Sequence, residues 1–229
     1  MSYRLLAAVL WIGVPAAVAQ PADSLKAEAA ETPEAVAADA VALAASLAAY
    51  GRRSGAAHAL VAAAALLTEN PPYLGRLTSE DGLPLSSGAA LPLDAVALLD
   101  EAEAATDPAD PIRQQIAALR DSAAAHPPPV AVRGAERGPI QYAGASDGDS
   151  DRRLAIRFRG RETARLHLIG SGASDLDYYL YDANGQLVAS DEGPSDSATL
   201  FWYVPYRQRL TLRVRNRGDR QNPYHLVTN

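Results

Sequence analysis

Hydrophobic positions recur with two different periods, and the change of period divides the chain into two halves. In the first half apolar residues follow the three-to-four-residue spacing of amphipathic helices. This spacing predicts four helices, over residues 34–50, 54–69, 93–105 and 111–125. Thr32 and Pro33 suit the N-cap and the first position of the first helix. The apolar positions of that helix are Val36, Ala40, Leu43, Leu47 and Tyr50.

From residue 140 onward apolar and polar residues alternate, which is the period of a half-buried strand. Several apolar residues alternate with arginine in this way: Leu154, Ile156, Phe158, Leu210, Leu212 and Val214. Short strands with turns about every 8–12 residues predict an antiparallel β-sandwich. The expected fold class is therefore α+β with two domains, a small N-terminal α-helical bundle followed by a C-terminal antiparallel sandwich.

The first 19 residues have the features of a secretory signal peptide. Arg4 precedes an apolar run over residues 5–18, and Ala17-Val-Ala19 is a small-x-small cleavage site. The run is shorter than the roughly 20 apolar residues of a membrane anchor, and it contains Pro15. We expect export to the periplasm or the cell exterior, with no membrane span after cleavage.

Cysteine usage and charge narrow the function classes. The chain has no cysteine, which excludes a disulfide framework, a thiol nucleophile and a thiolate zinc site. Residues 20–126 carry six basic and fifteen acidic residues, whereas residues 127–229 carry fourteen arginines and twelve acids. This asymmetry supports two domains. The proline run after His126 places a linker over 127–139, between a helical domain over 20–126 and a sandwich over 140–229. The arginines are interleaved with acids, so a nucleic-acid partner is not expected.

Residues 175–193 are the most informative stretch and predict a β-hairpin. Asn184-Gly185 favours a two-residue type I′ turn. Counting from that turn places Tyr179 opposite Ser190. The open end of the hairpin then gathers four carboxylates: Asp175, Asp177, Asp191 and Glu192. Opposed carboxylates repel one another, so a bound calcium ion with oxygen ligands is one interpretation. Solvation of a loop is the other.

Aromatic and arginine residues on the strands suggest a binding surface. Strand alternation exposes some of the tyrosines, so Tyr179, Tyr181 and Tyr203 are candidates for a ligand face, the alternative being core and cross-strand pairs. A ladder of arginines predicts a solvated strand face that protects a sheet edge, with polyanion binding as the alternative. The ladder consists of Arg209, Arg213 and Arg215.

The order of these motifs resembles the bacterial pre-peptidase C-terminal (PPC) domain. The resemblance covers roughly residues 140–229 and rests on the run Asp175–Asp182, on Asn184-Gly185 and on Asn222-Pro-Tyr224. It implies a jelly-roll-like sandwich attached to secreted proteins, and some related modules bind calcium, collagen or sugars. The usual neighbour, a peptidase domain, has no counterpart here, which implies an accessory role. Residues 47–67 resemble one tetratricopeptide-like helical hairpin, without the further copies of a repeat array.

No catalytic motif accompanies this resemblance. The four histidines lack zinc-ligand spacing, and the sequence contains no Gly-x-Ser-x-Gly, Walker or dinucleotide-binding pattern. The leading hypothesis is an exported, non-catalytic binding or adaptor protein whose sandwich recognises protein or glycan, with calcium as a stabilising ligand. One alternative is a structural partner that docks onto an envelope complex through its helical domain. The other is an unrecognised hydrolase that joins His, Ser and Asp from distant strands.

Overall fold

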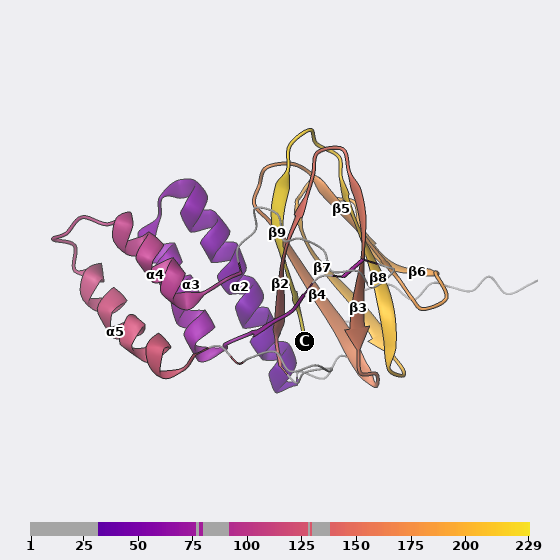
Figure 1. Ribbon diagram of the computed structural model, residues 1–229, viewed down its shortest axis with the longest axis horizontal. Coiled ribbons are helices and arrows are strands. Elements are labelled where there is room, and N and C mark those ends of the chain that lie inside the picture. Colours follow the sequence, from indigo (N-terminus) through magenta and orange to yellow (C-terminus); the bar gives the residue numbers. More distant parts are fainter. Residues whose placement is uncertain (1–31, 77, 80–91, 128, 130–137) are drawn as a thin grey trace, which may run out of the picture.

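The computed structural model describes residues 32–76, 78–79, 92–127, 129 and 138–229. The expected signal peptide, residues 1–19, lies outside the described residues. Within them the fold is α+β, as predicted: a layer of helices lies against one side of a two-sheet β-sandwich (Figure 1).

Four described helices form the helical layer. They are α2 (Pro33–Ser54), α3 (Ala57–Glu69), α4 (Ala95–Ala104) and α5 (Ile112–Ala125). Thr32 caps α2 as expected, because its Oγ1 accepts the Ala35 amide at 3.2 Å. The break expected at Gly51 is wrong, since α2 continues to Ser54 and ends at Gly55 with φ 69°. Instead, Gly51 allows α2 to pack closely against α3, because a Cβ added there would lie 2.8 Å from the Leu60 side chain.

The buried face of α2 is made mostly of alanine. Six alanines, Val41 and Gly51 are buried along this helix. The large apolar residues Val36, Leu43 and Tyr50 are 51%, 52% and 54% exposed. Small side chains allow α2 to approach both α3 and the sheet closely, which leaves the larger ones outside. By length and composition α2 could also cross a membrane, but 44% of its apolar window is buried within this molecule.

The sandwich has the strand order of a jelly roll. One sheet has the order β1-β2-β9-β4-β7 and the other β3-β8-β5-β6. The strands are β1 (Tyr73–Leu74), β2 (Ile140–Ser146), β3 (Asp151–Phe158), β4 (Glu162–Gly170), β5 (Leu176–Tyr181), β6 (Leu187–Asp191), β7 (Ser197–Val204), β8 (Gln208–Asn216) and β9 (Asn222–Thr228). The predicted inward positions are confirmed, because Leu154, Ile156, Leu210 and Leu212 are at most 1% exposed between the sheets.

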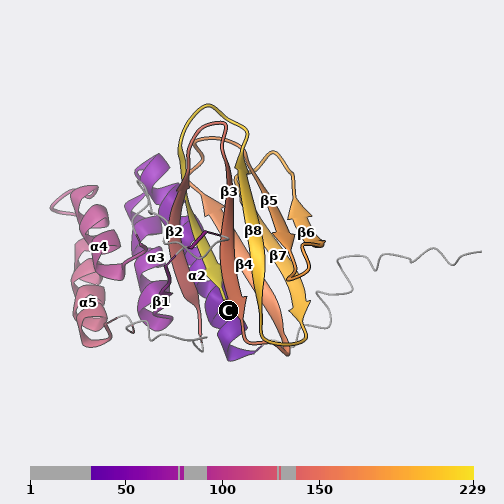
Figure 2. The same cartoon turned by 45° about the vertical axis from the view of Figure 1, so that its right-hand side comes forward.

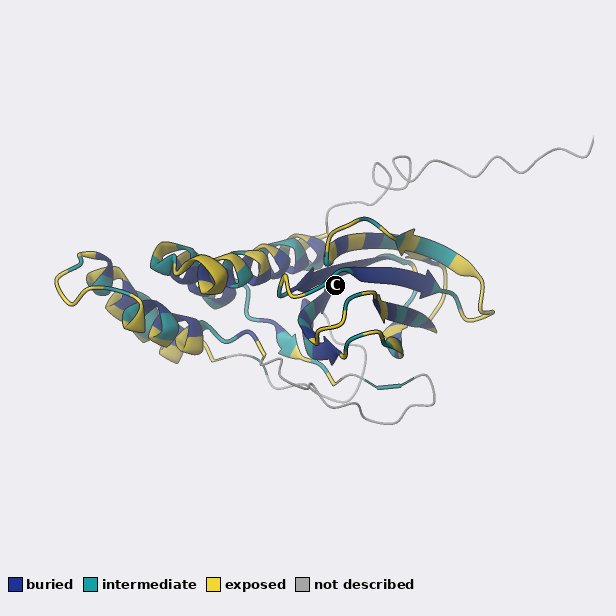
Figure 3. Ribbon diagram, turned by 90° about the horizontal axis from the view of Figure 1, so that it is seen from above, coloured by how far each residue is buried: buried dark blue, intermediate teal, exposed yellow. Residues whose placement is uncertain are grey.

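The helical layer and the sandwich share a continuous core. α2 lies on β4 and β9, and Ile169 and Val227 of those strands belong to the helical core. The Gln141 side chain on β2 bonds both the amide and the carbonyl of Leu93, at 2.8 and 2.7 Å. Figure 2 shows the helices on one side and the β3-β8-β5-β6 sheet facing away from them. Figure 3 shows buried positions in both parts. The helices and the sandwich are thus two packed layers, and β1, from the first half of the chain, is a strand of the sandwich.

Candidate binding face and the polar ends of the sandwich

The β5–β6 hairpin turns differently from the prediction. The Gly185 amide donates to the Asp182 carbonyl at 3.1 Å, and Gly185 has φ 77°, whereas Asn184 does not have positive φ. This fits a type I turn followed by a left-handed glycine bulge, so the type I′ prediction is wrong. Asp182 is the reason, because its Oδ1 accepts the amides of Asn184 and Gln186 at 2.8 and 2.9 Å. The Gln186 amide bond contributes most to lowering the pKa of Asp182.

The extra loop residue changes the pairing near the turn and leaves it unchanged further along. Tyr179 lies opposite Ser190, as predicted, whereas Tyr181 pairs with Leu187 across a bulge. The predicted carboxylates beyond Tyr179 therefore keep their expected strand positions.

Two of the four predicted carboxylates lie on the outer side of β5, around an arginine. Asp177 is fully buried, and its Oδ2 pairs with Nε of Arg217. Glu192 Oε2 lies 3.6 Å from the same guanidinium. This pairing with Asp177 is the main reason why the pKa of Arg217 is raised. The sequence indicated a need for positive charge here, and Arg217 supplies it from the loop after β8.

The other two carboxylates lie on the inner side, near the Tyr178 hydroxyl. Asp191 pairs with Tyr178 across the hairpin. The Tyr178 hydroxyl donates to the Asp196 carbonyl at 2.7 Å. Burial, followed by the negative charges of Asp196, Asp191 and Asp175, raises the pKa of Tyr178. The predicted set of four is thus divided between the two sides of β5.

The described residues contain no group of three or more His, Asp and Glu side chains arranged to hold a metal ion. Among these residues, Asp175 and Asp177 each keep a buried Oδ1 without a hydrogen-bond partner. Calcium binding at this end of the hairpin stays a prediction.

The outer surface of the β3-β8-β5-β6 sheet is called the open face here. Its side chains form rows because the four strands are in register. One row holds Arg153, Arg213, Tyr179 and Ser190. The next holds Ala155, Thr211, Tyr181 and Leu187. No described helix covers this face, because the helical layer lies on the other sheet (Figure 2).

Arginine and tyrosine side chains contact one another across the open face, and these contacts restrict their positions. The Arg213 guanidinium lies 5.1 Å from the centre of the Tyr179 ring, and that of Arg153 lies 5.9 Å from the Tyr181 ring. Arg213 also forms an ion pair with Asp151, which lowers the pKa of that carboxyl. These contacts hold a flat aromatic and cationic surface in a fixed arrangement.

The predicted ligand face is brought together only in part. Tyr179 and Tyr181 lie side by side on the open face, Tyr179 being 9% exposed. Tyr203 lies on β7 in the other sheet and is 50% exposed, so it belongs to a different surface. The prediction that the arginine ladder of β8 protects an edge is wrong, because β8 lies between β3 and β5.

A polar cluster connects α2 to the β1-β2-β9-β4-β7 sheet, which is called the covered sheet because the helical layer lies on it. His167 lies on the face of β4 that points away from the sandwich core, yet it is only 9% exposed because α2 covers it. Its Nε2 lies 2.8 Å from Asp39 Oδ1, and its Nδ1 lies 3.2 Å from Thr199 Oγ1. Arg165 pairs with the same Asp39 at 2.7 Å. The order acid, imidazole, hydroxyl resembles a catalytic triad, but the shared arginine and the tight packing are those of a structural connection.

A second histidine lies between the helices and the covered sheet. His225 on β9 faces the helical layer, opposite Ile169. Its Nδ1 is buried without a hydrogen-bond partner among the described residues. Burial, aided by the nearby Arg52 cation, lowers the pKa of His225 to about 4. The sequence offered no signal for this, because its alternation does not show which strand face a helix covers.

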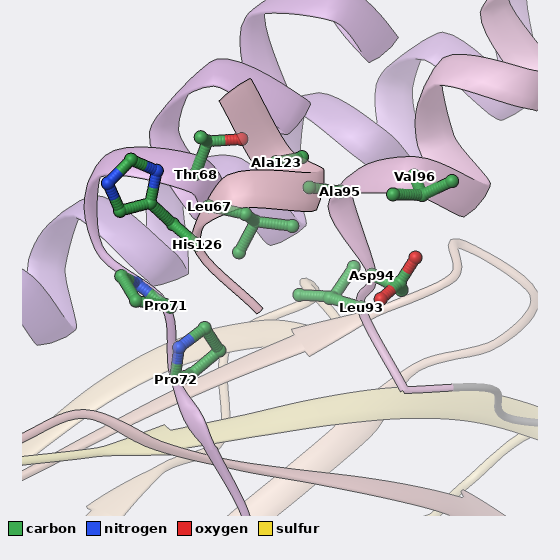
Figure 4. A pocket seen from close by; sticks show the side chains of 10 residues that line it. All are labelled: Leu67, Thr68, Pro71, Pro72, Leu93, Asp94, Ala95, Val96, Ala123 and His126. Atoms are coloured by element: carbon green, nitrogen blue, oxygen red, sulfur yellow. The ribbon is translucent and has the colours of Figure 1, made fainter. Parts of the chain in front are cut away.

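A small cavity lies within the helical layer (Figure 4). Its volume is about 30 Å³, which holds about two water molecules and no substrate of ordinary size. It is lined by Leu67, Thr68, Pro71, Pro72, Leu93, Asp94, Ala95, Val96, Ala123 and His126. The cavity includes none of the residues of the His167 cluster.

Comparisons with known proteins give partial likenesses at low identity. No protein-family model matches the chain, and no curated protein matches it. One similar structure is PliG of Aeromonas hydrophila, a periplasmic inhibitor of g-type lysozyme, with 13% identity and a TM-score of 0.32, covering 43% of this chain and 90% of that one. The pre-peptidase C-terminal domain of a Bacillus anthracis collagenase has 11% identity and a TM-score of 0.23, covering 39% and 75%.

A third similar structure is the lectin binding domain of Lectinolysin in complex with Lewis b. It has 12% identity and a TM-score of 0.28, covering 38% of this chain and 70% of that one. The PPC resemblance thus has a counterpart among solved structures at low identity and partial coverage. Likenesses of this degree carry no conclusion about the ligand. The tetratricopeptide-like hairpin stays a prediction.

Proposed function

We propose that this chain is an exported, non-catalytic binding protein that recognises a protein or a glycan through its open face. The observation that supports this most is the asymmetry of the sandwich. The helical layer covers one sheet, while no described helix covers the other, on which arginines contact the rings of Tyr179 and Tyr181. Tyrosine and arginine are enriched among the residues that dominate binding energy.

The chemistry of the open face suits a flat, polar ligand. The Tyr181 ring offers an apolar surface with a hydroxyl at its edge, and Arg153 lies over it. Leu187, in the same row, is 51% exposed and extends the apolar part of the surface. Sugar rings and extended peptide segments both combine apolar faces with hydrogen-bonding groups, so either fits.

A glycan array and a panel of secreted proteins, both probed with the purified chain, would test this proposal. We expect a ligand whose affinity falls at least about tenfold, or about 1.4 kcal/mol, in Tyr181→Ala and Arg153→Ala. Tyr206→Ala is the matched control, because Tyr206 is 60% exposed and lies outside the open face. Binding that survives both open-face variants but is lost when the helical layer is altered would favour docking through the helices.

Calcium at the end of the hairpin is a second part of this proposal. Its support is the buried Oδ1 atom of Asp175, which has no hydrogen-bond partner among the described residues and lies near Asp191 on the inner side of β5. Backbone carbonyls and water would complete the coordination. We expect calcium at 100 times its Kd to add about 2.7 kcal/mol of stability and Asp175→Ala to abolish this gain. An unchanged melting temperature at millimolar calcium would assign both aspartates a structural role.

A further inference from the structure

Two turns that join the two sheets meet at one end of the sandwich. The β3–β4 turn covers residues 159–161 and the β7–β8 turn covers residues 205–207. A Cβ added at Gly160 would lie 2.2 Å from the carbonyl carbon of Tyr206 and 2.4 Å from the amide nitrogen of Arg207. The two turns are therefore in direct backbone contact, at the lower end of the sandwich in Figure 1.

Positive charge is concentrated at this end, although the whole chain has a net charge of −6. The segments 157–163 and 203–209, which include the two turns, contain one acid, Glu162. They contain five arginines, which are called the basic end here: Arg157, Arg159, Arg161, Arg207 and Arg209. Glu162 offsets one of them, since its Oε2 lies 3.7 Å from the Arg159 guanidinium.

Three arginines of the basic end have no carboxylate partner. Arg157, Arg161 and Arg207 are exposed, and within the described part of the chain none of them forms an ion pair. Arg161 and Arg207 belong to the two turns that touch, so two like charges are attached to neighbouring backbone positions, where they repel each other. An anion bound at this end would offset that repulsion.

Arg161 occupies a backbone conformation that arginine rarely adopts. Its φ is 59°, and among the described residues Asp149 is the only other one besides glycines with a positive φ. In this conformation the Arg161 amide donates to the Val204 carbonyl at 2.6 Å. Glycine would adopt it without steric cost. Strained residues of this kind concentrate at functional sites, so an arginine at this position indicates a use for its side chain.

We infer that the basic end binds an acidic polysaccharide, whose sulfate or carboxylate groups are contacted by Arg157, Arg161 and Arg207. A guanidinium binds such groups with two parallel hydrogen bonds, which gives orientation as well as strength. A polysaccharide carries its charges at repeated intervals, so several arginines can bind one chain. The net negative charge of the rest of the molecule favours the approach of a polyanion at this end.

An exposed aromatic ring beside the basic end favours a sugar over other anions. Tyr203 is 50% exposed and pairs with Thr163, two residues from Arg161. A tyrosine ring offers an apolar face with a hydroxyl at its edge, and a sugar ring has an apolar face between its polar substituents. Tyr203, which lies apart from Tyr179 and Tyr181, therefore belongs to this site.

Calorimetric titration of the purified chain with heparin, a sulfated polysaccharide, and with polygalacturonate, a carboxylated one, would test this inference. We expect at least one of them to bind at low salt and to bind more weakly as the salt concentration rises. Arg161→Gln combined with Arg207→Gln, the site variant, should weaken binding at least about tenfold. Arg53→Gln combined with Arg220→Gln is the matched control and should change binding little. It removes two exposed arginines at the other end of the sandwich and gives the same net charge.

Arg161→Gly separates binding from stability, because it removes the charge and the backbone strain together. We expect its melting temperature to equal or exceed that of the wild type, since glycine adopts a positive φ freely, while its affinity for the polysaccharide falls. A lower melting temperature with unchanged affinity would show that Arg161 is kept for the fold and would overturn its assignment to the site.

Three further outcomes would overturn the inference. The first is that neither polysaccharide binds at low salt. The second is an equal loss of binding in the site variant and in the control, which would mean attraction by overall charge alone. The third is tighter binding of polyglutamate or of phosphatidylserine vesicles than of either polysaccharide, which would make the ligand an acidic protein or a membrane.

The test also separates the basic end from the open face. Polysaccharide binding that survives in the site variant but is lost in Tyr181→Ala belongs to the open face and overturns this inference while supporting the proposed function. Binding lost in the site variant supports the basic end whether or not the open face has a ligand of its own. Circular dichroism of each variant distinguishes loss of binding from loss of the fold.

Discussion

The two sheets of the sandwich have the same sequence pattern and different surroundings. Arg165 and His167 alternate with buried leucines on β4, as Arg213 and Arg215 alternate with buried leucine and valine on β8. On β4 these polar residues are 9% exposed beneath α2, where Asp39 pairs with both. On β8 they remain at the surface of the open face. Alternation along a strand determines which side chains point away from the sandwich core. The presence or absence of the helical layer determines whether those side chains are buried and paired or remain at the surface.

The largest effect on stability should come from replacing Arg217, the cation that pairs with a buried carboxylate of the β3-β8-β5-β6 sheet. Arg217→Met would leave the fully buried Asp177 without its partner. We expect a larger loss in the free energy of unfolding than from any other variant proposed here, because the buried carboxylate is left uncompensated. Urea unfolding measures this loss. Arg215→Met is the control, and Asp177→Asn combined with Arg217→Met should recover much of the stability.

The pH dependence of unfolding would show whether the stability of the covered sheet depends on a neutral His225 side chain. The pKa of His225 is about 4 in the folded chain, below its ordinary value of 6.5. The unfolded chain therefore takes up a proton first as the pH falls, and stability declines between these two values. At about pH 4.5 the loss should be about 2 kcal/mol relative to neutral pH.

His225→Gln isolates this contribution, because glutamine does not titrate. Acids such as Asp151, whose pKa is lowered, also cost stability at low pH. The difference between wild type and variant removes their share. Equal pH dependence of the two proteins in urea unfolding would show that His225 is not held neutral by burial.

The connection between α2 and the covered sheet should have an intermediate effect. Asp39→Ala removes the partner of Arg165 and His167, which leaves the largely buried guanidinium of Arg165 without a compensating negative charge. We expect a loss of about 1–2 kcal/mol, limited by the 46% exposure of the Asp39 side chain. Thermal unfolding measures it, with Glu34→Ala as a control on the same helix. An unchanged stability would mean that apolar packing alone holds α2 on the sheet.

The smallest effect on stability should come from the open face itself. Arg157 is exposed at the end of its strand, in the row with Arg209. Replacing it with alanine should change the free energy of unfolding by no more than about 0.5 kcal/mol. A larger loss in urea unfolding would give this part of the face a structural role and would weaken the contrast between the two sheets.

Some structural features of this molecule could be predicted from short stretches of sequence, because the interactions that form them join residues close together in the chain. Thr32 caps α2 through a bond to a residue three positions away, and the apolar residues of β3 and β8 face the core because side chains alternate along a strand. Asp177 also carried a signal, since a carboxylate opposite Glu192 needs compensating charge. The partial failure of the hairpin prediction is also local, because Asp182 favours a type I turn over the expected type I′ turn.

The remaining features depend on contacts between distant residues. Arg217 lies 40 residues from the aspartate that it neutralises, and Asp39 lies 126 residues from Arg165. The burial of alanine instead of Leu43 on α2 follows from how closely the helix meets the sheet, which periodicity does not encode. The sequence by itself determined the strands from β3 onward, their inward sides and the fold class, because these follow from short-range periodicity. The tertiary structure alone decided which sheet the helices cover and where each polar side chain finds its partner.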